Sequence, residues 1–159
     1  KRRNPRDTSK EFVGNIWSQS KHIKEKEEMK YSLTIPIPLP SLNKTFLQNH
    51  WQRNKDKQIF KKLVRQEVES QKLPRISGPI ELTIQNFSKR KLKSYDIDNM
   101  SPKWLIDGLT DEWIKIGNKR VLIHKGIILD DTASTIRRII LEAVESSGIK
   151  TEIVIKPYK

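Results

Sequence analysis

The sequence contains no cysteine and no long uninterrupted run of apolar residues. The missing thiols exclude disulfide frameworks, thiolate metal sites and cysteine nucleophiles, and they suit a reducing compartment. A membrane-spanning helix needs roughly 18 consecutive apolar residues, and no stretch of the chain approaches that length. The amino end also lacks the apolar core of a secretory signal peptide. We therefore expect a water-soluble protein of the cytosol.

Acidic residues are few relative to basic ones. The 159 residues include 19 Asp and Glu against 32 Lys and Arg, which leaves a formal net charge of +13. Hydrophobic residues make up 35% and charged residues 32%, so we expect one domain with a core beneath a highly charged surface. This charge favours a polyanionic partner, nucleic acid before an anionic membrane. The basic residues are not gathered on one long helix opposite an apolar face, which argues against the membrane.

The first part of the chain differs in composition from the rest. Residues 1–28 contain few apolar side chains, and we expect a disordered leader or extension there, ahead of a folded domain over residues 29–159. The leader holds 8 basic and 5 acidic residues, so 24 basic and 14 acidic residues remain in the domain. The positive field therefore belongs to the domain as well. The sequence does not distinguish a vector-derived tail from an upstream extension or a genuine arm.

Runs of alternating or β-branched apolar residues predict four strands. They are expected over residues 30–37, 79–87, 135–141 and 151–155. The first run ends in Pro36, Pro38 and Pro40, which lack the N–H that a sheet needs. This strand is therefore predicted to lie at a sheet edge or to end near Ile35, with a turn over residues 41–43. The last two runs are separated by Ser-Ser-Gly and predict a closing hairpin.

Helical patterns occupy the middle of the chain. Residues 53–72 have apolar side chains at a helical period, with lysines over the other face, and predict a basic amphipathic helix. Ser101 as a cap and Pro102 at the first helical position predict a short helix over residues 103–109. Residues 110–125, with a Gly-Asn turn, are expected to form a hairpin-like insertion. Together these elements predict an α+β fold, a small mixed β-sheet with two main helices.

Two acidic clusters stand out in this basic chain. Asp96 and Asp98 lie at i and i+2, so their side chains converge on one side if the segment is extended. Asp130 and Asp131 follow an apolar run, at a point where a strand would end. Carboxylate oxygens are ligands for Mg²⁺, which could orient a scissile phosphate and activate a water. The open alternative is that these aspartates only cap turns and loops.

Two groups of basic residues are candidate DNA contacts, because Lys and Arg supply affinity by neutralising phosphates. One group lies immediately before the first acidic cluster, and the other lies on the predicted basic helix. A solvated surface is the open alternative for both. Three tryptophans, Trp51, Trp104 and Trp113, could stack on bases or pack in the core. The candidate DNA contacts are Lys89, Arg90, Lys91, Lys93, Lys55, Lys57, Lys61 and Lys62.

A series of short motifs runs along the chain in order. A proline-rich first strand and a basic helix precede Asp96-Ile97-Asp98-Asn99, then Lys103, Asp107-Gly108-Leu109 and Asp130-Asp131. This series resembles the RusA family of Holliday-junction resolvases over residues 29 to about 158. The sequence departs from the family pattern in two places. Three residues rather than two precede the lysine after the motif's asparagine, and the stretch before the last acidic pair is longer than in compact members.

The resemblance implies a small α/β homodimer that resolves four-way DNA junctions by symmetric paired nicks. Its cofactor would be Mg²⁺, with Mn²⁺ as a substitute, and a metal-activated water would hydrolyse the phosphodiester. Asp96, Asp98 and Asp131 match the family's metal-binding and catalytic aspartates, with Asp130 beside the last. Lys103 matches the catalytic lysine, whose ammonium would stabilise charge on the scissile phosphate. Phages and prophages often encode proteins of this type, which implies the bacterial cytosol.

Two other interpretations stay open. The chain could be a non-catalytic branched-DNA-binding protein with the same fold, because fold alone does not establish function. Such a protein would bind junctions without cutting them under any metal. It could also be a different metal nuclease that acts on single strands, flaps or RNA with the same acids. A panel of labelled branched, duplex and single-stranded substrates would separate these cases.

Overall fold

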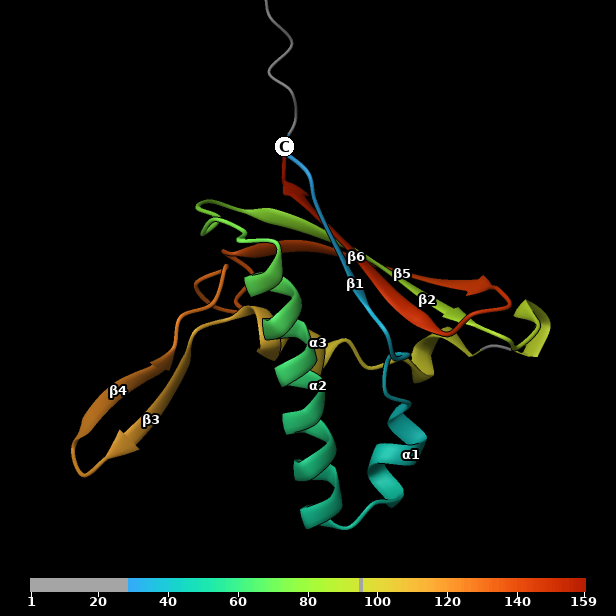
Figure 1. Ribbon diagram of the computed structural model, residues 1–159, viewed down its shortest axis with the longest axis horizontal. Coiled ribbons are helices and arrows are strands. Elements are labelled where there is room, and N and C mark those ends of the chain that lie inside the picture. Colours follow the sequence, from blue (N-terminus) through green and yellow to red (C-terminus); the bar gives the residue numbers. More distant parts are fainter. Residues whose placement is uncertain (1–28, 95) are drawn as a thin grey trace, which may run out of the picture.

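The computed structural model describes residues 29–94 and 96–159, and the leader predicted at residues 1–28 lies outside the described residues (Figure 1). A four-stranded mixed sheet packs against helices, and a two-stranded hairpin projects away from both (Figure 1). This is the mixed α+β arrangement that the sequence predicts. Within the described residues, no helix is long and apolar enough to cross a membrane.

The secondary structure agrees with most of the predicted elements but contains an additional helix. In chain order the described elements are β1 (Tyr31–Ile35), α1 (Leu42–Leu47), α2 (His50–Ser70), β2 (Ile80–Ser88), the 3-10 helices η1 (Leu92–Ser94) and η2 (Ile97–Asn99), α3 (Lys103–Leu109), β3 (Glu112–Ile116), β4 (Lys119–His124), β5 (Ile136–Glu145) and β6 (Lys150–Pro157). Helix α1 stands where a turn was predicted. The side-chain oxygen of Asn99 accepts the N–H of Asn43, 2.9 Å away, and so caps α1 from a distant part of the chain.

The four-stranded sheet has the order β1-β6-β2-β5. Strand β6 is antiparallel to both neighbours, and β5 runs parallel to β2. The predicted edge position of β1 is confirmed. The predicted closing hairpin is wrong, because β2 lies between β5 and β6 although these two follow each other in the chain. The connection over residues 146–149 crosses the end of β2, a span of about two strand spacings or 10 Å.

One apolar core lies between the inner face of the sheet and the helices. From the sheet it contains residues such as Leu33, Leu82 and Ile153, and from the helices Phe60, Val64, Leu105 and Leu109. The two longer helices approach closely at Gly108 of α3. A Cβ at this glycine would lie 2.8 Å from the Cβ of Val64 on α2, so a larger residue would push the helices apart.

A buried polar contact directs the proline-rich segment towards the loop that holds the first acidic cluster. The side-chain oxygen of Asn86 in β2 accepts the N–H of Leu39 at 3.0 Å, and the Thr151 hydroxyl donates to the carbonyl of Ile37 at 2.8 Å. The carbonyl of Pro40 then accepts the N–H of Ser101 at 3.0 Å. These bonds hold residues 36–41 across the sheet and beside the start of α3.

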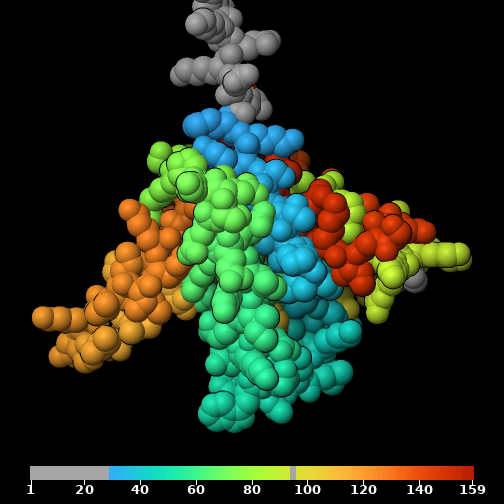
Figure 2. Space-filling view, in the orientation of Figure 1, coloured from blue at the N-terminus to red at the C-terminus, as the bar shows by residue number. Residues whose placement is uncertain are grey.

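The predicted hairpin over residues 110–125 is confirmed as β3 and β4, which project as an arm (Figure 2). Gly117 forms its turn with a positive φ of 60°, a conformation that favours glycine. The guanidinium of Arg75 holds the base of the arm through two 2.9 Å bonds to Asp111. The carboxylate of Asp111 also accepts the N–H of Gly126 at 2.8 Å. The insertion is therefore anchored where it leaves and rejoins the fold.

Candidate functional site

The first acidic cluster lies in a single 3-10 turn between β2 and α3. The segment was expected to be extended, but Ile97–Asn99 form η2, and both Asp96 and Asp98 are exposed. The turn still brings the two carboxyl groups together. A hydrogen bond with Asp98, followed by repulsion from its charge, raises the pKa of Asp96 above its ordinary value. The convergence predicted from spacing therefore occurs through a tight turn and not through a strand.

Lys103 is the first residue of α3 and contacts two carboxylates. Its ammonium lies 2.6 Å from Oδ2 of Asp131 and 3.0 Å from Oδ1 of Asp107, one turn along the same helix. The other oxygen of Asp107, Oδ2, forms an ion pair with the ammonium of Lys57 on α2, 2.8 Å away. Two lysines from facing helices thus share one carboxylate.

The start of α3 differs from the prediction. Pro102 and not Ser101 occupies the cap position of α3, and no side chain caps it, so the predicted serine cap is wrong.

The charges in this cluster stabilise one another. The hydrogen bonds that the Lys103 ammonium donates, to Asp131 first and Asp107 second, raise its pKa and keep the side chain protonated. Burial alone would raise the pKa of Asp107, but the hydrogen bonds from Lys57 and Lys103 outweigh burial and lower it. The arrangement therefore holds an ammonium at a fixed place beside a half-exposed carboxylate, Asp131.

The adjacent aspartates of the second cluster have different partners. Oδ1 of Asp130 accepts the hydroxyl of Thr135 at 2.6 Å, the hydroxyl of Thr132 at 2.7 Å and the backbone N–H of Thr132 at 3.1 Å. These bonds, the one from Thr135 above all, lower the pKa of Asp130. Asp130 thus stabilises the loop that enters β5, while Asp131 turns to Lys103. The sequence placed both aspartates at the metal site and left open which would bind the metal directly; in the structure Asp131 is the one that contacts Lys103.

The two acidic clusters do not merge into one larger group within the described residues. Within residues 29–94 and 96–159, no group of three or more His, Asp or Glu side chains is close enough to hold a metal ion. Mg²⁺ is usually bound by one or two carboxylates, with waters and substrate phosphates as its other ligands. Asp96 and Asp98 fit that requirement, since they offer hard oxygen donors that already approach each other. Only four residues separate Asp98 from Lys103 along the chain.

The candidate DNA contacts differ in exposure. Lys89, Arg90, Lys91 and Lys93 are all exposed on the loop after β2, and Lys55 and Lys62 are exposed on α2. Lys57 is half-buried in its contact with Asp107. Lys61 is only 5% exposed and binds Glu112 of the arm at 2.5 Å, so its expected place on an open basic surface is wrong. A buried lysine is stable when paired, and the inserted arm supplies the acid.

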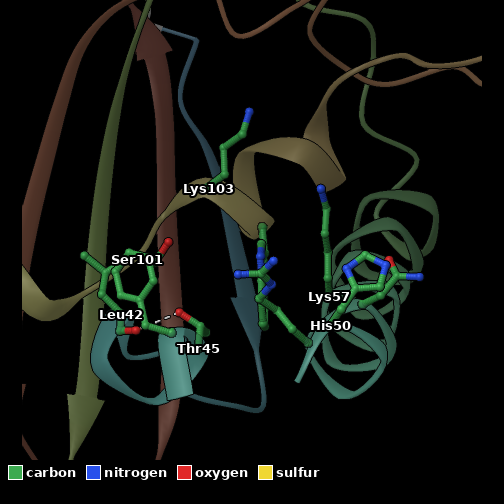
Figure 3. Close-up of a pocket in the computed structure, with 10 residues that line it drawn as sticks. Leu42, Thr45, His50, Lys57, Ser101 and Lys103 are labelled. Carbon is green, nitrogen blue, oxygen red and sulfur yellow. Dashed lines mark hydrogen bonds between the residues drawn. The ribbon is translucent and has the colours of Figure 1, made fainter. Parts of the chain in front are cut away.

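A cavity of about 450 Å³ opens between α1, the first half of α2 and the start of α3 (Figure 3). His50, Arg53, Asn54 and Lys57 line it from one face of α2, because they recur at i, i+3, i+4 and i+7. The predicted helix began only at residue 53 and so left out His50, whereas Lys57 was among the predicted DNA contacts. The walls also include Phe46, Lys103 and Trp104.

Trp51, Trp104 and Trp113, three of the four tryptophans, lie in different surroundings. Trp51 at the start of α2 and Trp113 on the arm are exposed, and Trp104 packs partly against the core and lines the cavity. Of the two roles left open by the sequence, packing in the core therefore applies in part to Trp104 and not to Trp51 or Trp113. Trp104 is the one placed beside Lys103.

No protein-family model matches the chain, and no curated protein matches it either. The resemblance to RusA resolvases therefore rests on the motifs alone. The structure adds the contacts of the individual residues: an aspartate pair in a tight turn and, five residues on, a lysine held by two more aspartates.

Proposed function

We propose that this chain is a Mg²⁺-dependent endodeoxyribonuclease that resolves four-way DNA junctions by paired nicks. The observation that carries the proposal is the lysine held by Asp131 and Asp107 just after the exposed pair Asp96 and Asp98. Phosphodiester hydrolysis needs acids that can hold a metal and a cation that stabilises charge on the phosphate. The charge of +13 supports a polyanionic substrate.

Each residue of the site has a distinct role in this proposal. Asp96 and Asp98 would hold Mg²⁺, which when bound supplies an activated water and a Lewis acid for the phosphate. Lys103 places its ammonium where negative charge develops in the transition state. Asp131 keeps Lys103 in position through their 2.6 Å contact. Asp107 orients Lys103 from within α3, and its second partner, Lys57, fixes it against α2.

Substrate binding in the proposal comes from the exposed basic side chains. The run before the acidic motif is tied to the end of β5, where the N–H of Leu92 donates to a carboxylate oxygen of Glu145 at 3.4 Å. Phosphates bound there would lead the strand towards Asp96. Two symmetric nicks need two sites, which a twofold homodimer supplies with one site in each subunit.

The test is cleavage of a labelled synthetic four-way junction beside linear duplex of the same sequence. The reactions contain Mg²⁺, Mn²⁺ or EDTA, with wild type, Asp98→Asn and Glu69→Gln. Glu69 is an exposed acid on α2 outside the cluster and serves as the matched control. We expect paired nicks on the junction alone with either metal. Asp98→Asn should reduce cleavage by about 100-fold or more, and Glu69→Gln should cut like wild type.

Two results would contradict the proposal in different ways. Tight binding of the junction without cutting under either metal would indicate a non-catalytic branched-DNA-binding protein. Metal-dependent cutting of single strands, flaps or RNA in place of the junction would indicate a nuclease with another substrate. A substrate panel with the same protein preparations distinguishes them.

A further inference from the structure

Helix α2 carries a basic face that the chain's own acids neutralise only in part. Lys61 binds Glu112, and Lys57, one turn earlier, binds Asp107. Arg53 lies one turn earlier again and lines the cavity. No ion pair joins Arg53 to an acid within the described ranges. The first turns of the face therefore keep positive charge that a bound anion could neutralise.

The size and lining of the cavity indicate a flat ligand as well as an anionic one. Its volume of about 450 Å³ falls within the range of ligand pockets. Phe46 of α1 stands at its wall with 74% of its surface exposed, although it is a large apolar side chain. Trp104 of α3 contributes a second ring. Aromatic rings beside cations are typical of sites that stack a base and hold its phosphate.

The cavity shares Lys103 with the proposed site of cleavage. Figure 3 shows Lys57 and Lys103 at its wall, from α2 and α3. Both ammonium groups bind Asp107, and Lys103 also binds Asp131. A ligand that occupies the cavity would therefore contact the same lysine that the proposed chemistry uses.

We propose that this cavity binds one unstacked nucleotide of the DNA strand next to the scissile phosphate. Its base would stack on Phe46 and Trp104, and its phosphate would contact Arg53. A branch point supplies nucleotides that leave the stack easily, and continuous duplex does not. The cavity would thus select branched over linear DNA. This inference rests on the proposed nuclease function, because the ligand is taken to be its substrate strand.

The experiment uses Asp98→Asn protein, which retains the cavity, with a four-way junction carrying 2-aminopurine at the branch point. Fluorescence of 2-aminopurine reports the stacking of that base, and anisotropy of a separate label reports affinity. Phe46→Ala and Arg53→Gln are added to the Asp98→Asn background. The matched controls are Leu47→Ala, 89% exposed beside Phe46, and Lys44→Gln, an exposed cation on α1 outside the cavity.

We expect a binding-dependent change in 2-aminopurine fluorescence that Phe46→Ala abolishes and the controls keep. The dissociation constant for the junction should rise by about tenfold in Phe46→Ala and Arg53→Gln, and linear duplex should be affected less. Both altered side chains are exposed, so thermal melts should match the parent protein. Unchanged fluorescence and affinity in both variants would overturn the proposal. Displacement of the junction by micromolar thymidine monophosphate would also overturn it, in favour of a free-nucleotide site.

The same variants with Asp98 intact separate this inference from the nuclease proposal. If the Phe46→Ala and Arg53→Gln variants cut the junction as fast as the wild type, nucleotide binding in the cavity would be refuted and the nuclease proposal supported. If these variants abolish the fluorescence change but the wild type does not cut the junction, nucleotide binding in the cavity would be supported and the nuclease proposal refuted.

Discussion

Asp130 and Asp131 show how two identical neighbouring side chains acquire different tasks. Asp130 accepts three hydrogen bonds from Thr132 and Thr135 and stabilises its own loop. Asp131 reaches across to Lys103, 28 residues away in the chain. A carboxylate with local donors stabilises a loop, whereas one paired with a distant ammonium can position it. Substitution of the two residues should therefore affect different properties.

We expect Asp131→Ala to lower junction cleavage by about 100-fold at an unchanged Tm, because it removes the closest partner of the proposed catalytic ammonium. Asp130→Ala should lower Tm instead, since two hydroxyls and an N–H lose their acceptor. Cleavage assays and thermal melts on both proteins measure the two effects. Equal loss of cleavage at unchanged Tm would show that both aspartates act in the site.

Lys103→Gln should slow the cleavage step by about 100-fold or more, because no ammonium remains to stabilise charge on the phosphate. Its effect on affinity should be much smaller than its effect on rate. Single-turnover cleavage with saturating protein separates the two quantities. Lys103→Arg keeps the charge and should recover part of the rate. A loss confined to affinity would make Lys103 a simple phosphate contact.

Helix α1 depends on a cap from another part of the chain. Its first turn has no side-chain cap at Ser41, and the oxygen of Asn99 accepts the Asn43 N–H instead. The asparagine of the acidic motif thus holds the wall of the cavity. Loss of a helix cap costs about 1 kcal/mol. Because α1 has 6 residues and no buried side chains, this loss should unfold it locally.

Asn99→Ala should therefore speed hydrogen exchange of the α1 amides while the amides of α2 keep their protection. Exchange followed by mass spectrometry on peptides from the two helices measures this. Asn99→Asp retains an oxygen acceptor and should keep α1 protected. Uniform loss of protection in both helices would indicate that Asn99 stabilises the whole fold and not α1 alone.

The arm formed by β3 and β4 depends on ion pairs at its base, because an isolated two-stranded hairpin is only marginally stable in water. Arg75 binds Asp111, whose side chain is 4% exposed, and Lys61 and Arg65 bind Glu112. The hydrogen bond from Arg75 is the largest cause of the lowered pKa of Asp111. These contacts join the arm to α2 and to the loop after it.

Arg75→Met should destabilise the protein by about 1–3 kcal/mol at pH 7, because Asp111 loses its charged partner. The pKa of Asp111 is lower in the folded protein than in the unfolded chain, so the stability it adds is present above its unfolded pKa. That stability disappears as pH falls through the folded value. The difference in Tm between Arg75→Met and wild type should therefore shrink below about pH 4. A difference in Tm that does not change with pH would contradict the assignment of this stability to the Arg75–Asp111 pair.

The charge of the whole molecule is not equally available to a ligand. Of the basic residues predicted to contact DNA, Lys61 is buried and Lys57 is paired, whereas the loop after β2 and the outer side of α2 are exposed. Net charge therefore overstates the surface that can contact phosphates. The affinity for DNA should fall as salt rises, because each contact releases counterions.

The double variant Arg90→Gln, Lys93→Gln should reduce the slope of log affinity against log salt by about 2, one for each lost phosphate contact. Lys55→Gln, Lys62→Gln removes the same charge from α2 and should change the slope less. Junction binding by Asp98→Asn protein at several salt concentrations measures both. A larger decrease in slope for Lys55→Gln, Lys62→Gln than for Arg90→Gln, Lys93→Gln would indicate that the DNA binds on α2.

Several features of the fold follow from local sequence alone. The prolines after Ile35 end β1 and suit it to an edge, and the Gly-Asn pair forms the turn of the arm. The helix predicted over residues 53–72 overlaps most of α2, which spans His50–Ser70. The i, i+2 spacing of Asp96 and Asp98 also indicated their approach. Each depends on backbone preferences or on side chains a few residues apart, which a short window of sequence contains.

Other features depend on contacts between distant residues, and no local pattern contains them. Strand β2 lies between β5 and β6, Lys61 is buried because Glu112, 51 residues later, binds it, and Asn99 caps a helix 56 residues earlier. The division of roles between Asp130 and Asp131 depends in the same way on where Lys103 lies. Local periodicity specifies which residues form a strand or helix. Strand partners, ion pairs and the cavity depend on how those elements pack.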